Sequence, residues 1–301
     1  MSELFKEITP HVKLLYTYTP IPAYEKYIGA YLCTGRKNAI IDPGPKTAIP
    51  GLIKAIKEVG LQPEQIDYIM LTHIHIDHAG GTGTALKLLK NARVVVNQRG
   101  VKHLIDPAAL TKGSIDTLGE LVSEYGEIEP VDADRIITGE DGKIIDLGNS
   151  KLQIVLTPGH AAHHLCIFEP AKGVLFSGDT AGIFHNGLLR LTTPPPFRLR
   201  ETLESLDKIT ALNPKIICYG HLGGYDDAKN RILEIKILLL HWYDYAQTRV
   251  KQGQSYTGVL DELIQEKPEL SAYFAALDKD ARKRDYNQLI NSVTGLMTAS
   301  S

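Results

Sequence analysis

The sequence predicts an α/β fold with a helical C-terminal appendage, and three observations support this class. Through residues 1–225, apolar runs of strand-like composition alternate with segments whose apolar residues recur at helical spacing. Several of the strand-like runs end directly before His or Asp, which indicates side chains gathered at one edge of a sheet. Residues 226–301 keep helical spacing and carry no His after His241. We therefore expect a first domain at residues 1–225 and a helical segment at residues 226–301.

The first domain is predicted to begin with antiparallel strands and to continue as a strand–helix–strand unit. Its first runs are rich in Tyr and β-branched residues and are separated by turns that contain Pro or Gly. A helical pattern follows and stops at Gly60, and the apolar run after it reads as a buried strand. The expected strands lie at residues 11–18, 27–33, 38–42, 66–71 and 93–97, and the expected helices at residues 51–59 and 82–90.

The second half of this domain is harder to interpret at its start. Residues 99–135 hold short helical patterns that are interrupted by Pro107, Gly113 and Gly126, so no strand is assigned there. Strand patterns return after residue 142 and are joined by polar or Gly-containing turns. The expected strands lie at residues 143–146, 151–156, 165–168, 174–176 and 215–219, and the expected helix at residues 201–212.

The composition is that of an ordinary globular protein, with 43% hydrophobic and 23% charged residues. A formal net charge of −2 argues against a nucleic-acid partner bound through its phosphates. The most apolar stretch, residues 235–243, is short and contains Lys236 and His241, so no membrane partner is expected. The N-terminus lacks the apolar core of a signal peptide and the Cys are widely spaced. We therefore expect reduced thiols and a cytoplasmic location.

The densest cluster of metal-ligating side chains follows the apolar run at residues 66–71. His73, His75, Asp77 and His78 lie within six residues of one another. Neutral imidazole nitrogen and carboxylate oxygen both suit zinc and its neighbours. Spacing of two residues puts His73 and His75 on the same side of an extended segment. Asp77 and His78 follow where the chain turns, so they can face a second metal close to the first.

Three further ligand candidates occur in matching contexts downstream. His160 ends the run Thr-Pro-Gly-His, Asp179 ends Ser-Gly-Asp, and His221 follows Gly220, each just after an apolar strand. Strand ends that gather at one sheet edge hold side chains on rigid elements. A single His at a strand end would be a weak signal, but the recurrence predicts one shared metal site.

These motifs resemble the signature of the metallo-β-lactamase fold superfamily, in a spacing most similar to glyoxalase II and the lactonase-like hydrolases. Ile41-Asp42-Pro-Gly is similar to its first motif, and the Ala-Ala-His-His after His160 departs from the usual pattern. The resemblance implies an αβ/βα four-layer sandwich as the catalytic domain. It also implies that His73, His75 and His160 bind one metal, that Asp77, His78 and His221 bind the other, and that Asp179 bridges them.

The expected reaction is hydrolysis of a small ester, thioester or lactone. Two divalent ions roughly 3.5–4 Å apart lower the pKa of a bridging water, so that a bridging hydroxide can attack at neutral pH. Zinc is the first expectation, and iron or manganese would suit the same ligands. Asp77 is the catalytic candidate that orients the nucleophile or moves its proton. Hydrogen-bonded support for the ligands is expected from Asp42, Thr72 and His164, and substrate contacts from Tyr24, Phe197 and Arg198.

The loops expected to rim the site favour a small substrate. Residues 19–24 and 192–197 are rich in Pro, which limits loop motion and favours a preformed pocket over an open track for a polymer. Arg190, Arg198 and Arg200 flank the second loop and are expected to hold one carboxylate or phosphate.

The C-terminal segment is predicted to serve association or closure of the site and to supply no metal ligand. A long helix is expected to about Val250, and two further helical patterns flank Pro268. The first helix is apolar over more of its circumference than one buried face requires, so a homodimer is the simplest expectation. The basic residues 282–284 are interpreted as a solvated helix face.

Two other functions remain open at this point. A nuclease of the same fold would need a basic track for phosphates, and residues 282–284 are the only candidate seen. A persulfide dioxygenase-like oxidoreductase keeps the same His-x-His-x-Asp-His string while using a single iron.

Overall fold

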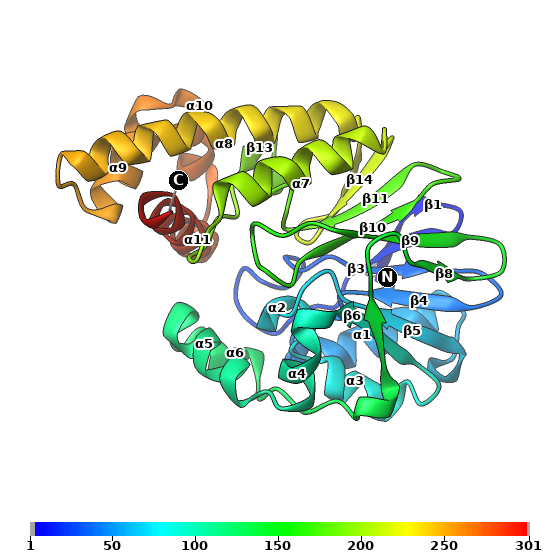
Figure 1. Cartoon of the computed structure of the whole chain (residues 1–301). Helices are drawn as coiled ribbons and strands as arrows, with labels where there is room; N and C mark the ends of the chain where they lie inside the picture. The colour runs from blue at the N-terminus through cyan, green and yellow to red at the C-terminus, as the bar shows by residue number, and fades with distance from the viewer. Residues whose placement is uncertain (1–3, 300–301) are drawn as a thin grey trace.

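Two β-sheets pack face to face in this computed structural model, which describes residues 4–299, and helices cover both outer faces (Figure 1). A seven-stranded sheet runs in the order β1-β2-β3-β4-β5-β6-β7. Its strands are β1 (Phe5–Thr9), β2 (Val12–Leu15), β3 (Ala30–Cys33), β4 (Asn38–Ile41), β5 (Ile66–Met70), β6 (Arg93–Asn97) and β7 (Ile136–Gly139).

The second sheet has six strands in the order β15-β14-β11-β10-β9-β8, and a small hairpin, β12-β13, stands apart from it. In chain order the strands are β8 (Ile144–Asp146), β9 (Lys151–Leu156), β10 (Leu165–Glu169), β11 (Val174–Gly178), β12 (Ile183–His185), β13 (Leu188–Arg190), β14 (Ile216–Tyr219) and β15 (Gly224–Asp226).

The first sheet confirms the predicted antiparallel start. Strands β1 to β4 pair antiparallel with their chain neighbours, and β4, β5, β6 and β7 then pair parallel. A helical segment connects each pair of neighbouring parallel strands, as parallel pairing requires. Strand β1 was not predicted, because its sequence Phe-Lys-Glu-Ile-Thr exposes one polar edge and lacks the apolar run of the others.

Three apolar layers hold the sandwich together. The layer between the sheets includes Tyr31 and Met70 from the first sheet and Phe176 from the second. A second layer joins the outer face of the first sheet to the helices that cover it, and a third does so for the second sheet. Helix, sheet, sheet and helix therefore follow one another, which confirms the four-layer prediction. The covering helices are α1 (Ile49–Glu58), α3 (Thr82–Leu88) and α4 (Gln98–Ile105) on one side and α7 (Leu199–Ala211) on the other.

Residues 99–135 contain helices that the sequence did not delimit. Beyond α4, the chain forms α5 (Ala108–Leu118) and α6 (Leu121–Tyr125) before β7. Gly119 and Gly126 have positive φ angles and end these two helices. Of the predicted glycine breaks, Gly126 is confirmed, but the one at Gly113 is wrong, because this residue lies inside α5. An isolated glycine is tolerated within a helix, and the short helices were too weakly periodic to assign.

The C-terminal segment contains one helix more than was predicted. Its helices are α8 (Ala228–Lys251), α9 (Tyr256–Glu266), α10 (Pro268–Ala276) and α11 (Lys279–Thr298). Buried residues of these helices belong to the same apolar cluster as the outer face of the second sheet. Figure 1 shows α11 on the side of the molecule where α2 (Ile76–Ala79) and α5 also lie. No helix within residues 4–299 combines the length and hydropathy needed to cross a membrane.

Candidate metal centre

The predicted ligands all lie at one edge of the sandwich, where strands of both sheets end. After β5 the chain is extended through His73 and His75 and then turns into α2, which carries Asp77 and His78. His160, Asp179 and His221 follow β9, β11 and β14 of the second sheet. The apolar strands anchor this edge, because each is buried between two layers immediately before its ligand. The structure therefore brings together side chains that are far apart in sequence.

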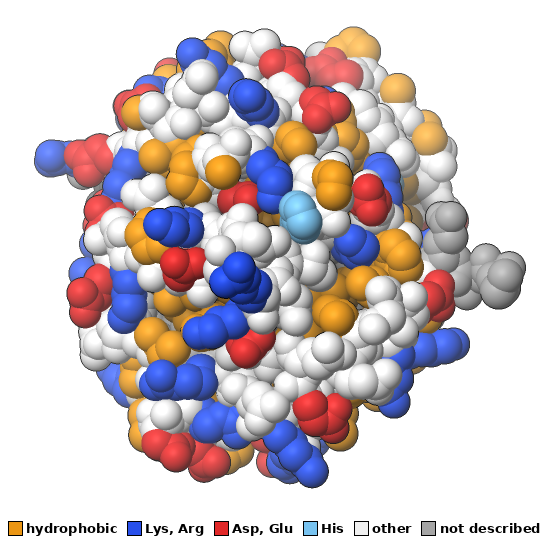
Figure 2. Space-filling model, turned by 90° about the vertical axis from the view of Figure 1, so that its right-hand side faces the viewer, with side chains coloured by type: hydrophobic (Ala, Val, Ile, Leu, Met, Phe, Trp, Pro, Cys, Tyr) orange, Lys and Arg blue, Asp and Glu red, His pale blue; other side chains and the backbone are white. Residues whose placement is uncertain are grey.

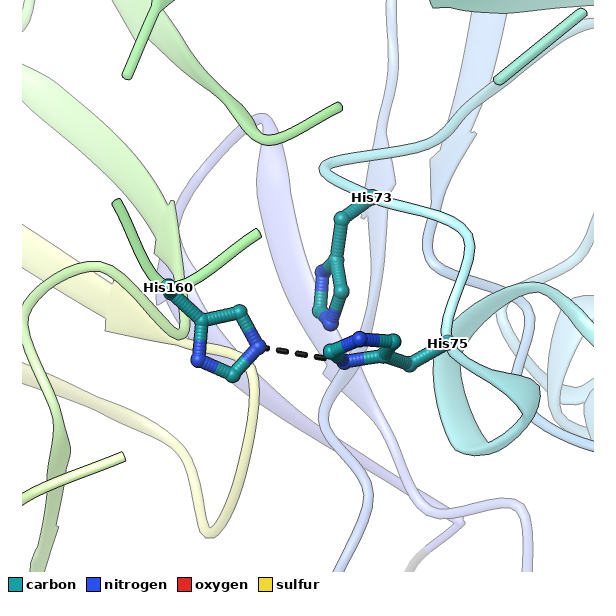
Figure 3. A group of neighbouring side chains, drawn as sticks. All are labelled: His73, His75 and His160. Carbon is teal, nitrogen blue, oxygen red and sulfur yellow. Dashed lines mark hydrogen bonds between the residues drawn. The ribbon is translucent and has the colours of Figure 1, made fainter. Parts of the chain in front are cut away.

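The first cluster consists of His73, His75 and His160 and is called the three-histidine group. One nitrogen of each ring lies within 4.8 Å of the others. The Nε2 atom of His160 is 3.1 Å from Nδ1 of His75. Figure 3 shows the three rings converging, two of them from the loop after β5 and one from the opposite sheet.

The second cluster consists of Asp77, His78 and His221 and is called the mixed group. Nε2 of His78 lies 3.2 Å from Nε2 of His221. Oδ2 of Asp77 is 3.7 Å from the first of these nitrogens and 3.6 Å from the second. These three ligand atoms also lie within 4.8 Å of one another. Two imidazoles and a carboxylate form a donor set that suits zinc, iron or manganese.

Asp179 lies between the two groups. Its Oδ1 atom is 3.5 Å from Nε2 of both His78 and His221. Its Oδ2 atom is 3.8 Å from Nε2 of His160. One carboxylate thus directs one oxygen toward each group, which is the arrangement that the predicted bridging role requires.

The donor atoms fit divalent metal ions. His73 Nε2 and Asp179 Oδ1 are buried and have no hydrogen-bond partner among residues 4–299. A buried polar atom without a partner costs free energy, and an ion would remove that cost. Two pairs of ring nitrogens face each other, one between His75 and His160 at 3.1 Å and one between His78 and His221 at 3.2 Å. Each pair has room for one proton at most. Lone pairs that converge in this way are typical of metal ligands.

For His73, His78 and His160, a neighbouring oxygen sets which ring nitrogen is free to bind a metal. The Thr192 carbonyl can only accept, so His160 donates its Nδ1–H to it at 2.7 Å and keeps an Nε2 lone pair. Asp42 Oδ2 lies 3.2 Å from His78 Nδ1 and accepts from the Thr72 hydroxyl at 2.6 Å. The same hydroxyl oxygen lies 3.0 Å from His73 Nδ1. The contacts of Asp42 and Thr72 are those expected of supporting residues.

His164 is placed to support Asp179 rather than to bind a metal. Its Nε2 atom accepts a hydrogen bond from the Asp179 backbone N–H at 3.1 Å. Its Nδ1 atom lies 2.8 Å from the Thr157 hydroxyl and 2.9 Å from the Thr180 hydroxyl. Both ring nitrogens therefore have protein partners, and neither is free to bind a metal.

Burial and carboxylates act in opposite directions on the imidazoles. Burial lowers the pKa of His73 and of His75 well below the ordinary value, because a charged ring would be desolvated. Burial also lowers the pKa of His78, but Asp77, Asp179 and Asp42 outweigh it and raise that pKa to about 10. Near neutral pH and without metal, the imidazoles of the three-histidine group are therefore neutral, whereas His78 of the mixed group is protonated.

The site opens into a cavity of about 880 Å³. Two of the residues expected to contact substrate, Tyr24 and Arg198, line this cavity. The third, Phe197, does not, because it is 4% exposed within the apolar cluster that includes α8. Phe197 lies two residues before α7 and packs in the same apolar cluster as the buried residues of that helix. Of the other predicted arginines, Arg190 is buried against Asp285. Arg200 is exposed and paired with Glu204.

The cavity has a wall that the sequence did not reveal. Helix α11 contributes Lys283, Arg284, Asn287 and further polar side chains. The interpretation of residues 282–284 as a solvated face fails at Arg284, which is only 8% exposed. Helical spacing gave no signal for this burial, because Arg284 lies roughly on the opposite side of α11 from the buried Leu289 and Val293. Helices α5 and α6 line the same cavity with side chains such as Ser114 and Tyr125.

Comparisons with known proteins agree with this geometry. The family model described as the metallo-beta-lactamase superfamily matches residues 29–221. The metallo-beta-lactamase fold-containing protein ST1585 of Sulfurisphaera tokodaii is 37% identical over 164 residues, which are 53% of this chain and 62% of that protein. A hydroxyacylglutathione hydrolase of Hydrogenovibrio crunogenus is 29% identical over 184 residues, covering 60% of this chain and 52% of the relative. Both alignments span less than two thirds of the relative.

Solved structures extend the likeness over most of the chain. The crystal structure of the archaeal ST1585 superposes with a TM-score of 0.72 at 27% identity, over 91% of this chain and 94% of that one. The metallo-beta-lactamase family protein TTHA1429 from Thermus thermophilus gives a TM-score of 0.69 at 22% identity, over 96% and 93% of the two chains. At that identity the second likeness concerns the fold alone.

Proposed function

The chain belongs to the metallo-beta-lactamase superfamily, and from its site we propose a dinuclear metal-dependent hydrolase of a small ester, thioester or lactone. Members of this superfamily are mostly metal-dependent hydrolases, and hydroxyacylglutathione hydrolases are among the relatives. The observation that carries the dinuclear proposal is Asp179, whose two oxygens face the two groups at 3.5 Å and 3.8 Å.

Each group would hold one divalent ion, zinc first among the metals that suit these donors. Such ions polarise a substrate oxygen and lower the pKa of a water between them. Asp77 is the residue proposed to orient that water and accept its proton, because it lines the cavity and remains partly exposed while its neighbours are buried. Asp42 and Thr72 hold His78 and His73 in the tautomers that leave Nε2 free.

The substrate is proposed to be small, partly apolar and anionic at one end. Ile21, Tyr24 and Leu121 give the cavity an apolar side. Arg198, Lys283 and Arg284 give it cationic groups, which can pair with a carboxylate or phosphate. On the face seen in Figure 2, Lys and Arg side chains are interspersed with Asp and Glu. A cavity with both apolar and cationic walls supports a small molecule better than a nucleic-acid strand.

A homodimer in the cytoplasm stays a prediction. Helix α8 exposes Leu233, Ile237 and Leu240, which recur at helical spacing, and Ile237 is 69% exposed. A second copy of the chain would bury this apolar stripe. Sedimentation of the protein at increasing concentration tests the proposal, and a monomer throughout would contradict it.

The experiment that tests the proposed function compares substrates on metal-loaded protein. We expect turnover of short acyl thioesters or lactones, and loss of that turnover in His160→Ala. The matched control is His11→Ala, which removes a histidine at the β1–β2 turn and should leave turnover unchanged. Cleavage of single-stranded RNA without ester hydrolysis would instead indicate the nuclease, and oxygen consumption with a persulfide would indicate the oxidoreductase.

A further inference from the structure

The C-terminal helix α11 reaches the metal centre through residues that bind no metal themselves. We propose that α11 positions one ligand of each group: His160 through the peptide bond between Thr192 and Thr193, and His221 through Tyr27. This proposal rests on the assignment of His160 and His221 as ligands. It gives the helical segment a role in metal affinity, beyond closing the cavity.

The first route begins with a buried loop that has no secondary structure of its own. Leu191 and Thr193 are 2% and 3% exposed, so their backbone groups need partners inside the protein. Helix α11 supplies them. The Leu191 carbonyl accepts from the Gln288 side chain at 2.6 Å and from the Ser292 hydroxyl at 2.8 Å. The Thr193 hydroxyl donates to the Ser292 carbonyl at 3.0 Å.

One peptide unit connects this loop to the metal ligand. The Thr193 N–H donates to the Ser292 hydroxyl at 3.3 Å, and the Thr192 carbonyl of the same peptide accepts from His160 Nδ1 at 2.7 Å. A planar peptide directs its N–H and its carbonyl to opposite sides. Ser292 therefore fixes the direction in which the carbonyl meets the imidazole, and with it the ring orientation and tautomer of His160.

Close packing supports the same contact. A Cβ added at Gly295 would lie 1.8 Å from the Thr193 carbonyl oxygen, so only glycine allows the helix to approach this loop. Gln288, Ser292 and Gly295 are spaced by four and three residues and thus share one face of α11. The Thr192 hydroxyl also donates to the Asp179 backbone carbonyl, which extends the support to the proposed bridge.

The second route acts by packing. His221 Nδ1 is buried without a hydrogen-bond partner among residues 4–299, so neighbouring side chains must set its orientation. The ring of Tyr27 lies against it, with the two ring centroids 4.4 Å apart. The Arg284 guanidinium lies 4.3 Å from the centroid of Tyr27 on α11's side of the contact.

A buried ionic cluster holds Arg284 in place. Its Nε donates to Asp285 Oδ1 at 2.7 Å, and its terminal nitrogen donates to the Ala23 carbonyl. Arg190 lies 2.9 Å from the same Asp285 oxygen. Asp285 is fully buried, so these pairs are little screened by solvent. The guanidinium over Tyr27 is therefore fixed from two directions.

The test measures metal affinity, not turnover. Metal-free protein is titrated with zinc against a chromophoric chelator to give two dissociation constants, and His160→Ala and His221→Ala identify which constant belongs to which group. Ser292→Ala should raise the constant that depends on His160 by about tenfold, as loss of support for a ligand commonly does. Arg284→Met should raise the other constant instead, and Arg284→Lys should restore much of it.

The control is Val293→Ala on another face of the same helix. Val293 is fully buried, so its truncation lowers stability without touching either route. Both constants should stay within about twofold of the wild type, because the ligands remain in place. A second readout is the Nδ1–H resonance of His160 in ¹⁵N-labelled protein, which should shift or broaden in Ser292→Ala and not in Val293→Ala.

The outcomes separate this proposal from the proposed function. If the wild type binds two ions and Ser292→Ala and Arg284→Met bind them with unchanged constants, the role of α11 is refuted. If Val293→Ala weakens the same constants equally, the effect is general stability and the proposal also fails. If the wild type binds no ion, the proposed function itself fails. Should Ser292→Ala not fold, Gln288→Ala removes one of the contacts and must weaken the His160-dependent constant alone.

Discussion

The three-histidine group and the mixed group have the same size but opposite electrostatic surroundings. Burial dominates around His73 and His75, whose pKa values are lowered, so their lone pairs are available near neutral pH. Three carboxylates dominate around His78 and raise its pKa to about 10. Metal must therefore displace a proton in the mixed group but not in the three-histidine group. Two sites built from similar side chains thus differ in how they are loaded.

The largest expected effect comes from the residue that the two groups share. Asp179→Ala should weaken the binding of both ions, because it removes the carboxylate oxygen that faces each group. The repulsion between the two cations would then lack the offset of a shared negative charge. Hydrolysis should fall by at least about 10²-fold, since the ions contribute several kcal/mol to the barrier. Metal analysis and kcat measurements check this. Retention of both ions at native affinity would remove Asp179 as the bridge.

Asp42 and Thr72 offer a way to affect the groups separately. Thr72→Val removes the hydroxyl beside His73 but leaves Asp42 beside His78. Only the three-histidine group should lose affinity, by about 10-fold or more. Asp42→Asn should weaken the mixed group directly, because it removes the charged acceptor of His78. Equal losses at both groups in Thr72→Val would show that the two supports are not separable.

Proton release on binding should distinguish the groups next. Because the pKa of His78 is about 10, filling the mixed group near pH 7 should release close to one proton from that ring. The neutral three-histidine group should release almost none. Calorimetric titration with zinc in buffers of different ionisation enthalpy measures both numbers. Equal release for the two ions would contradict the electrostatic difference.

The metal-free protein should show the same difference as a pH dependence of stability. The pKa of His78 is raised above its unfolded value of about 6.5, so its stabilising contribution is complete below that pH and is lost as the pH rises toward 10. The lowered pKa values of His73 and His75 act in the other direction, and their contribution is lost as the pH falls below about 6.5.

Thermal unfolding of metal-free wild type and of His78→Gln checks this sign. The variant should lose the decline in midpoint between about pH 6.5 and pH 10, because its side chain does not titrate. A decline of equal size in both proteins would assign the pH dependence to other groups.

The smallest expected effect concerns the exposed cation in the cavity wall. Lys283→Ala should reduce the preference for an anionic over a neutral thioester by less than about fivefold, since an exposed ion pair contributes at most about 1 kcal/mol. The ratio of kcat/KM for the two substrates measures it. Lys279→Ala, outside the cavity lining, is the matched control on the same helix.

Local patterns in the sequence were sufficient for the set of candidate ligands and for most strands of the two sheets, but not for β1, β7 or β15. Strands such as β6 and β9 are apolar runs bounded by turn residues, and their ends were predicted within one residue. The candidate ligands could be found because each lies shortly after an apolar strand-like run. Their position along the chain therefore indicated that they share one edge of the sandwich. The superfamily was recognisable from these motifs alone.

Only the tertiary structure decided which residues support and surround that edge. Arg284 and Ser292 lie on a helix whose polar residues read as solvated, yet both are buried against loops far away in the sequence. Phe197 faces the core and Lys283 the cavity for the same reason. Helical periodicity predicts which residues share a face of a helix. It does not predict what packs against that face, because contacts between segments distant in sequence leave no periodic pattern.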